Sequence, residues 1–384
     1  MKKIIAILLV ALMLVPSFAL GENIVKIGVF EPASGDSGAG GKQEMLGMQY
    51  ANSIQPTVEI GGETYTVELV YADNGSDQSK APSAAQQLVS EGVSVVLGSY
   101  GSGVSIAGSP IFEAAGVPAI GVTCTNPQVT AGNTHYFRIC FLDPFQGTVL
   151  ANYAFQELGA KTAYCLAENG NDYDVGLTHY FTEAFEALGG TVYSETFPNG
   201  TSDFTSYLSN ATAFGAEVFF CPVSIAYSTQ IINQAASQNV AYPIMGGDTL
   251  DSNKVIEAAQ GTNVSVIVST FYQEGGSPEF DEGFKAWLNE NSEALTNNGG
   301  NDMIAAVSVM GYDAYFTALE ALKLAGSTDP QAVMEALWNV DYTGVSGRIV
   351  FNEIGDANRD SAYIKAANAE TGAWDFVTMQ TVAE

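Results

Sequence analysis

The chain has 384 residues, 47% of them hydrophobic, and 42 acidic against 13 basic residues give it a formal net charge of -29. Such an acidic surface repels nucleic acid and anionic lipid, so we expect neither as a partner. The two histidines, His135 and His179, are isolated and no CxxC occurs, so metal binding and histidine-based catalysis have weak support.

Residues 1–19 are typical of a secretory signal peptide: two lysines precede an apolar run, and Ser17-Phe18-Ala19 fits a small-x-small cleavage site. The run is shorter than the roughly 20 apolar residues of a membrane-spanning helix. No cysteine near the cleavage site could carry a lipid anchor. We therefore expect a periplasmic or secreted protein, whose mature part is long enough for two domains of ~150 residues.

The first half of the mature chain alternates strands with helices. Apolar strand-like runs cover 24–30, 64–71, 95–98 and 117–121, and helical patterns cover 43–53, 79–91 and the segment between the last two strands. This alternation predicts a parallel, doubly wound sheet. Pro110 has two interpretations: either the helix kinks there, or a new helix begins with Ser109 as N-cap and proline at the first position.

A second series of the same α/β class follows Asp143-Pro144. Its helices are expected at 145–157, 174–188, 202–214 and 226–238, and its strands at 162–167, 191–195, 217–222, 241–246 and 264–270. Three helices at 281–289, 303–325 and 329–338 then follow one another, and short strands near 347–351, 362–366 and 376–379 close the chain.

The long helical return predicts that the chain re-enters its first domain. We therefore expect one lobe from 24–143 plus 272–361 and another from 144–271 plus 362–384, with a cleft between them.

Small hydroxyl residues and glycines follow two neighbouring strands. The segment from Ser99 to Ser102 follows one strand, and Thr123 and Thr125 follow the next. Ligands of open α/β sheets sit beyond the carboxyl ends of the strands, and amides at a helix start favour an anion such as a carboxylate. These strand ends therefore predict a ligand site, although the same residues are also common as ordinary turns and caps.

Two other features of the chain have simpler interpretations. The glycine-rich turn SGDSGAGG lacks a clean GxGxxG pattern, which disfavours nucleotide binding. The four cysteines, Cys124, Cys140, Cys165 and Cys221, lie mostly in apolar strand-like runs. We expect them to be free, buried thiols rather than disulfides.

Several motifs in one order resemble a known family. They are VKIGVFEPASG, the 98–127 stretch, LGAKTAYCLAENGNDYDVGL, PIMGGD, and YDAYFTALEALKLAGSTDPQAVMEAL followed by GVSGRIVFNEIGD. The whole mature chain resembles the type I periplasmic binding proteins of branched-chain amino acid transporters, the leucine/isoleucine/valine-binding proteins. The resemblance implies two doubly wound lobes joined by three crossovers, a non-enzymatic monomer without cofactors, and delivery of the ligand to an ABC transporter permease.

The resemblance also implies site residues. Ser102 would bind the ligand carboxylate, Thr123 and Thr125 would hold the α-ammonium through a backbone carbonyl and a hydroxyl, and Tyr173 would pack on the ligand. Asp248 would pair with the ammonium, although it is one methylene shorter than the glutamate of similar proteins. Alternatively, Asp248 caps the helix that starts near Ser252, and Tyr173 is an exposed turn residue.

Some positions depart from the family pattern. Gly40 and Val223 stand where the family has pocket aromatics, and Gly75 and Gly101 replace its disulfide cysteines. We therefore expect a differently shaped, roomier pocket. It leaves open an apolar amino acid, an aromatic or larger one, or a small amide or organic acid.

Two other classes of protein are rivals. A ligand-binding sensor lobe would act with a signalling partner instead of a permease. A hydrolase has less support, because no GxSxG elbow with a paired histidine occurs and Ser102 has no nearby base in the sequence.

Overall fold

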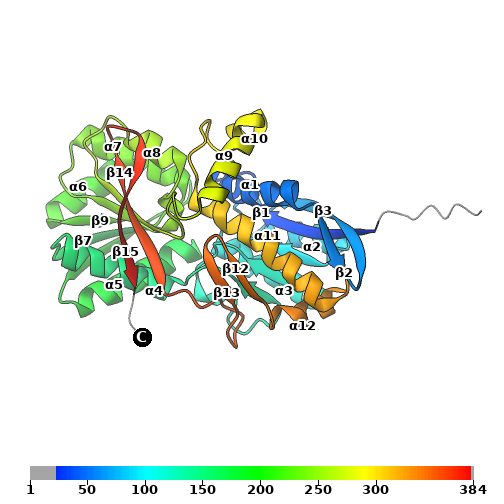
Figure 1. Cartoon of the computed structure of the whole chain (residues 1–384). Coiled ribbons are helices and arrows are strands. Elements are labelled where there is room, and N and C mark those ends of the chain that lie inside the picture. The colour runs from blue at the N-terminus through cyan, green and yellow to red at the C-terminus, as the bar shows by residue number, and fades with distance from the viewer. Residues whose placement is uncertain (1–22, 382–384) are drawn as a thin grey trace, which may run out of the picture.

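The computed structural model describes residues 23–381. Two β-sheets lie side by side, each with its own helices, and form two lobes (Figure 1). We call the six-stranded sheet with its helices the first lobe and the seven-stranded sheet with its helices the second lobe. The expected signal peptide, residues 1–19, lies outside the described residues.

The sheet of the first lobe has the order β2-β3-β1-β4-β5-β6. Its strands are β1 (Ile24–Glu31), β2 (Thr57–Ile60), β3 (Glu63–Asp73), β4 (Val95–Leu97), β5 (Ala119–Gly121) and β6 (Tyr136–Arg138). All neighbouring pairs are parallel except β2 with β3. Every residue of β4 and β5 is buried, as expected for short apolar strands covered on both faces. The sequence analysis missed β2 and β6, which are only 4 and 3 residues long.

The sheet of the second lobe has the order β15-β14-β11-β10-β9-β7-β8. Its strands are β7 (Thr162–Glu168), β8 (Thr191–Phe197), β9 (Val218–Phe220), β10 (Ile244–Gly246), β11 (Val266–Thr270), β14 (Ser361–Asn368) and β15 (Ala373–Thr381). The run from β7 to β11 is parallel, whereas β14 and β15 are antiparallel additions at one edge. The predicted α/β class with two doubly wound, mainly parallel sheets is confirmed.

Helices cover both sheets. They are α1 (Gly38–Ile54), α2 (Ala81–Ser90), α3 (Ser102–Ala115), α4 (Asp143–Asn152), α5 (Asp172–Ala187), α6 (Thr205–Phe214), α7 (Ile225–Gln238), α8 (Asn253–Ala259), α9 (Pro278–Glu290), α10 (Ser292–Asn297), α11 (Ala306–Ala325) and α12 (Pro330–Leu337). A hairpin of β12 (Asp341–Gly344) and β13 (Gly347–Val350) follows α12. None of the helices in residues 23–381 is long and apolar enough to cross a membrane.

The helix α3 is continuous through Pro110. Proline has no N–H, so the carbonyl of Ile106 loses its usual helical donor. The hydroxyl of Ser109 donates to that carbonyl instead, at 3.2 Å. Ser109 is therefore not an N-cap, and the interpretation of a second helix beginning at Pro110 is wrong.

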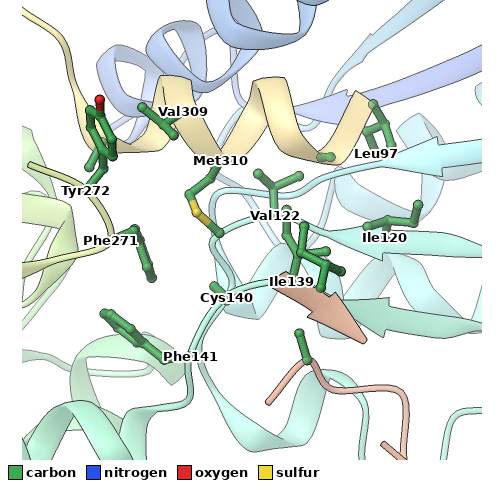
Figure 2. Packing of buried hydrophobic residues seen from close by; sticks show 14 of the residues in the cluster. Leu97, Ile120, Val122, Ile139, Cys140, Phe141, Phe271, Tyr272, Val309 and Met310 are labelled. Atoms are coloured by element: carbon green, nitrogen blue, oxygen red, sulfur yellow. The ribbon is translucent and has the colours of Figure 1, made fainter. Parts of the chain in front are cut away.

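The chain passes between the sheets three times, after β6, after β11 and before β14. Near the first two passages, Phe141 and Phe271 pack with their ring centroids 4.3 Å apart. Figure 2 shows these rings facing each other, with Met310 of α11 nearby. Apolar contacts therefore join the connecting segments. The lobe boundaries at 143/144, 271/272 and 361/362 stay a prediction.

The four cysteines are free thiols and all are buried, as predicted. Burial raises the pKa of Cys124 to about 11 and that of Cys165 to about 12. Since the thiolate is the reactive form, these side chains serve packing rather than chemistry.

Candidate functional site

The carboxyl ends of the parallel strands in the two lobes face each other across a cavity of about 460 Å³. The first lobe lines it with residues of the loops at 32–37, 75–78 and 100–104, and the second lobe with residues of 168–174 and Asn199, Ser224 and Thr249. In the first sheet, successive strands are added in opposite directions on either side of the boundary between β1 and β4. In the second sheet the same change of direction lies between β7 and β9. The cavity therefore lies where open α/β sheets bind ligands.

Ser102 is the first residue of α3 and lines this cavity. It is buried, and its hydroxyl oxygen accepts a hydrogen bond from the backbone N–H of Asn126 at 3.3 Å. The amides of the first turn of a 14-residue helix lie beside it. A hydroxyl and helix amides together form a site for an anionic group.

Tyr173 and Asp248 form a direct pair in the second lobe. Tyr173 is the second residue of α5, and its hydroxyl donates to Asp248 Oδ1 at 3.0 Å. Asp248 begins the 3-10 turn Asp248–Leu250 after β10, and Gln146 Nε2 donates to the same oxygen at 2.8 Å. Both residues are buried. A Cβ atom at Gly247 would lie 2.2 Å from the Tyr173 hydroxyl, so the second glycine of MGGD permits this approach.

The alternative roles for these two residues are wrong. Ser252 itself caps α8, because its hydroxyl oxygen accepts from the N–H of Lys254 at 3.3 Å. Asp248 is thus free of a capping role at that helix. Tyr173 is buried rather than exposed in a turn.

Thr123 and Thr125 follow β5 and lie deeper than the cavity lining. The hydroxyl of Thr123 donates to Glu44 Oε2 on α1. The carbonyl of Thr125 accepts from the N–H of Asp143 at 3.0 Å, and the nearby Thr125 hydroxyl partly offsets the raised pKa of the Asp143 carboxyl. The structure therefore brings Ser102 and Tyr173 to the cavity and places Thr123, Thr125 and Asp248 behind its wall.

Tyr100 is a site residue that the sequence analysis did not identify. It lines the cavity, and a Cβ atom at Gly40 would lie 2.4 Å from its ring. The ring packs with Ala305 and Val307, and its hydroxyl donates to the carbonyl of Thr249 at 3.4 Å. The expectation of a roomier pocket is wrong at Gly40, because Tyr100 fills that space. Its position three residues after the end of β4, in the loop before α3, was the signal that the sequence offered.

The two lobes are in contact around the cavity. Gln78 Nε2 donates to Asp172 Oδ2 at 3.0 Å, and Asn126 Nδ2 donates to the Asp172 carbonyl at 2.8 Å. Further along the cleft, the hydroxyl of Tyr227 donates to Asp36 Oδ2 at 3.2 Å. These bonds join loops of the first lobe to helices of the second, so the structure describes a closed arrangement.

Buried carboxyl groups surround the site. Burial raises the pKa of Asp248 to about 6, against partial lowering by the bonds from Gln146 and Tyr173. Burial also raises the pKa of Asp143 to about 8 and that of Asp174 well above its ordinary value. None of these three carboxyls belongs to an ion pair among residues 23–381. Desolvated acids without a cation favour a ligand that brings a positive charge.

These carboxyls predict the pH dependence of stability without ligand. The folded protein holds protons on Asp143 and Asp248 that the unfolded chain releases near pH 4. Because the folded state binds more protons, the free energy of unfolding falls as the pH rises from 5 to 8. We expect the Tm to fall over this range in a buffer of constant, high ionic strength.

The matched control for this pH series is Asp143→Asn, which removes one of the groups that hold a proton in the folded state and should flatten the slope. A Tm that stays constant or rises between pH 5 and 8 would contradict the raised pKa values.

No group of three or more His, Cys, Asp or Glu side chains in the described part of the chain is arranged to hold a metal ion.

Comparisons with known proteins find similar sequences over most of the chain. A family model described as periplasmic binding protein matches residues 24–371. The chain is 28% identical over 338 residues to a Leu/Ile/Val-binding protein homolog 1 of Brucella abortus, covering 86% of this chain and 87% of that protein. It is 27% identical to an amino acid binding protein of Pseudomonas aeruginosa, covering 92% of both chains.

Two of the solved structures that are similar to this chain are also binding proteins. A leucine binding protein, LivK, of Thermotoga maritima is 32% identical and superposes with a TM-score of 0.83, covering 93% of this chain and 99% of that chain. A solute binding protein of an ABC transporter from R. palustris, in complex with benzoate, is 19% identical with a TM-score of 0.79, covering 94% and 98%. The second likeness shows the fold alone.

Proposed function

Since this chain belongs to the periplasmic binding protein family, we propose that it captures a free, apolar amino acid between its lobes and delivers it to an ABC transporter permease. The family consists of substrate-binding rather than catalytic proteins. One observation carries the choice of ligand class. Ser102 at the anion-binding start of α3 and Tyr173 line one cavity between the lobes, and the buried acid Asp248 accepts a hydrogen bond from Tyr173 behind the cavity wall. A zwitterionic ligand needs both an anion-binding group for its carboxylate and an acid for its ammonium group.

Each site residue has a role in this proposal. The Ser102 hydroxyl and the first amides of α3 bind the ligand carboxylate. The Thr123 carbonyl, the Thr125 hydroxyl and the Asp248 carboxylate hold the ammonium group. The Tyr173 ring packs on the ligand, while its hydroxyl keeps Asp248 oriented. Tyr100 narrows the side-chain end of the pocket, which suits an apolar chain better than a large aromatic one.

A small organic acid is the second candidate, because α3 would bind any carboxylate and the R. palustris protein of the same fold holds benzoate. The buried Asp248 opposes it. Its pKa of about 6 leaves this carboxyl mostly charged at neutral pH, it has no basic partner in the described ion pairs, and a ligand without a cation would leave its charge uncompensated. The amino acid is therefore favoured.

We expect ligand binding to reduce the radius of gyration. Ser102 and Tyr173 sit on different lobes, so the site is complete only when the lobes meet. Small-angle X-ray scattering should show a larger particle after unfolding, dialysis and refolding without ligand, and a smaller one after the amino acid is added. Mass spectrometry of the released compound identifies the natural ligand.

The D-enantiomer of the same amino acid is the control for closure, because it cannot place carboxylate, ammonium and side chain together. A radius that does not change while calorimetry shows saturation would disprove closure.

We also propose that the protein works as a monomer outside the cytoplasm, with the permease as its partner. Family membership supports the location, since the family is one of periplasmic proteins.

A further inference from the structure

Two glutamates make a buried contact behind the first-lobe side of the site. Glu31 is the last residue of β1, and Glu44 lies on α1, one turn after Gly40. Their exposed fractions are 1% and 0%. Neither was identified from the sequence, because each lies in a segment whose other residues are mainly apolar or small.

Both carboxyls bond to residues in the loops that follow β4 and β5. Glu31 Oε2 accepts from the backbone N–H of Tyr100 at 2.7 Å, and Glu44 Oε2 accepts from the Thr123 hydroxyl. The Oε1 atoms of both have no hydrogen bond to another group in the described residues. The interaction of the two carboxyls raises the pKa of Glu31 and lowers that of Glu44. Two carboxyls in contact need a proton between them, and these directions assign the proton to Glu31 and the accepting role to Glu44.

The surroundings of this pair are acidic or neutral. Burial raises the pKa of Glu31 and of Glu44, and the nearby charge of Asp248 raises that of Glu44 further. Cys124 and Tyr136 are the other titratable groups near Glu31, Tyr100 and Tyr136 lie near Glu44, and the Tyr100 N–H opposes the shift of Glu31. No Lys, Arg or His pairs with either glutamate among residues 23–381. A buried carboxyl of this kind is partly protonated at neutral pH until a cation arrives.

We propose that Glu44 is a second acidic recognition group for the ammonium of the ligand, acting from the first lobe opposite Asp248, and that binding expels a proton from it. Glu44 holds the hydroxyl of Thr123, whose carbonyl is the proposed ammonium acceptor. In this proposal the ammonium lies between Asp248 and Glu44, behind the residues that line the cavity. When it arrives, Glu44 loses its proton to solvent, while Glu31 keeps its own and still donates to Glu44. This inference rests on the proposed function.

The test is calorimetric titration with the amino acid in two buffers of different ionisation enthalpy, between pH 6 and 8. Wild type should release protons, and its affinity should fall with acidification, by at most tenfold per pH unit for one proton. The variant Glu31→Gln/Glu44→Gln keeps the shape and the donors but cannot ionise. It should release fewer protons and bind the amino acid roughly tenfold more weakly. Its affinity for the des-amino analogue should not fall, which separates charge from damage to the fold.

Glu31 has a test of its own. Glu31→Met removes the hydrogen-bond donor to Glu44, so the affinity for the amino acid should fall more at pH 6 than at pH 8. Glu31→Gln keeps a donor at this position and should restore the milder pH dependence. Glu91→Gln, an exposed acid paired with Lys26 far from the cavity, is the matched control and should behave as wild type.

The outcomes distinguish this inference from the proposed function. If wild type binds an organic acid but no ammonium-bearing compound, both are wrong. If wild type binds amino acids through Asp248 but the double glutamine variant equals it in affinity, proton release and pH profile, only the role of Glu44 is wrong.

Discussion

Replacing Asp248 by alanine is expected to weaken amino-acid binding by roughly 30-fold or more. The carboxylate is buried and held by Gln146 and Tyr173, so the ligand ammonium would meet a desolvated, oriented charge. Truncating one partner of such a pair costs roughly 2–5 kcal/mol, at about 1.4 kcal/mol per tenfold in affinity. Calorimetric titration of wild type and variant with a panel of amino acids and their des-amino analogues measures the effect.

Ser252→Ala is the matched control, since Ser252 caps α8 four residues from Asp248. Loss of a cap costs about 1 kcal/mol of stability and should leave affinity nearly intact. Asp248→Asn, which keeps the shape, should lose almost as much affinity as the alanine variant. Equal binding of the amino acid and its des-amino analogue by wild type would contradict the zwitterion, and an organic acid or amide would become the better ligand.

Replacing Arg138 by methionine is expected to destabilise the protein by roughly 3–5 kcal/mol, the usual cost of breaking a buried ion pair from one side. Arg138 is fully buried, and its Nε donates to Asp356 Oδ1 at 2.8 Å. It also donates to the carbonyls of Cys124 and Asn126 at 2.9 and 2.5 Å and to the Thr130 hydroxyl at 3.1 Å. The change would leave one carboxylate and three other acceptors without this donor.

The effect of this change should reach the ligand site, because Arg138 fixes the loop that carries Thr123 and Thr125. Thermal unfolding should show a loss of roughly 10 °C in Tm, and calorimetry should show weaker binding. Arg348→Met is the matched control. Its bidentate pair with Asp341, at 2.7 Å, is exposed, and exposed pairs contribute little. Equal Tm losses for the two variants would contradict this account.

The sequence determined the architecture because strand and helix periodicity is a local property. Apolar runs such as Val95–Leu97, alternating with helical patterns, predicted two doubly wound sheets, and polar residues after two strands predicted Ser102 and Thr123 near a ligand site. Strands β2 and β6 escaped this reasoning, although β4 and β5, with three residues each, did not. β6 is defined by its pairing with β5 and, at Arg138, with Asp356, which are contacts between distant segments.

Only the tertiary structure decided how the pocket is filled and charged. Tyr100 occupies the space that Gly40 leaves, although 60 positions separate them in the sequence. Glu31 and Glu44 come from a strand and a helix, and neither segment carries a pattern that brings the two carboxyls into contact. Periodicity tells which side of an element is buried, but the partner of a buried side chain depends on how elements distant in the chain pack. Ligand class therefore followed from contacts between segments, whereas fold followed from the segments themselves.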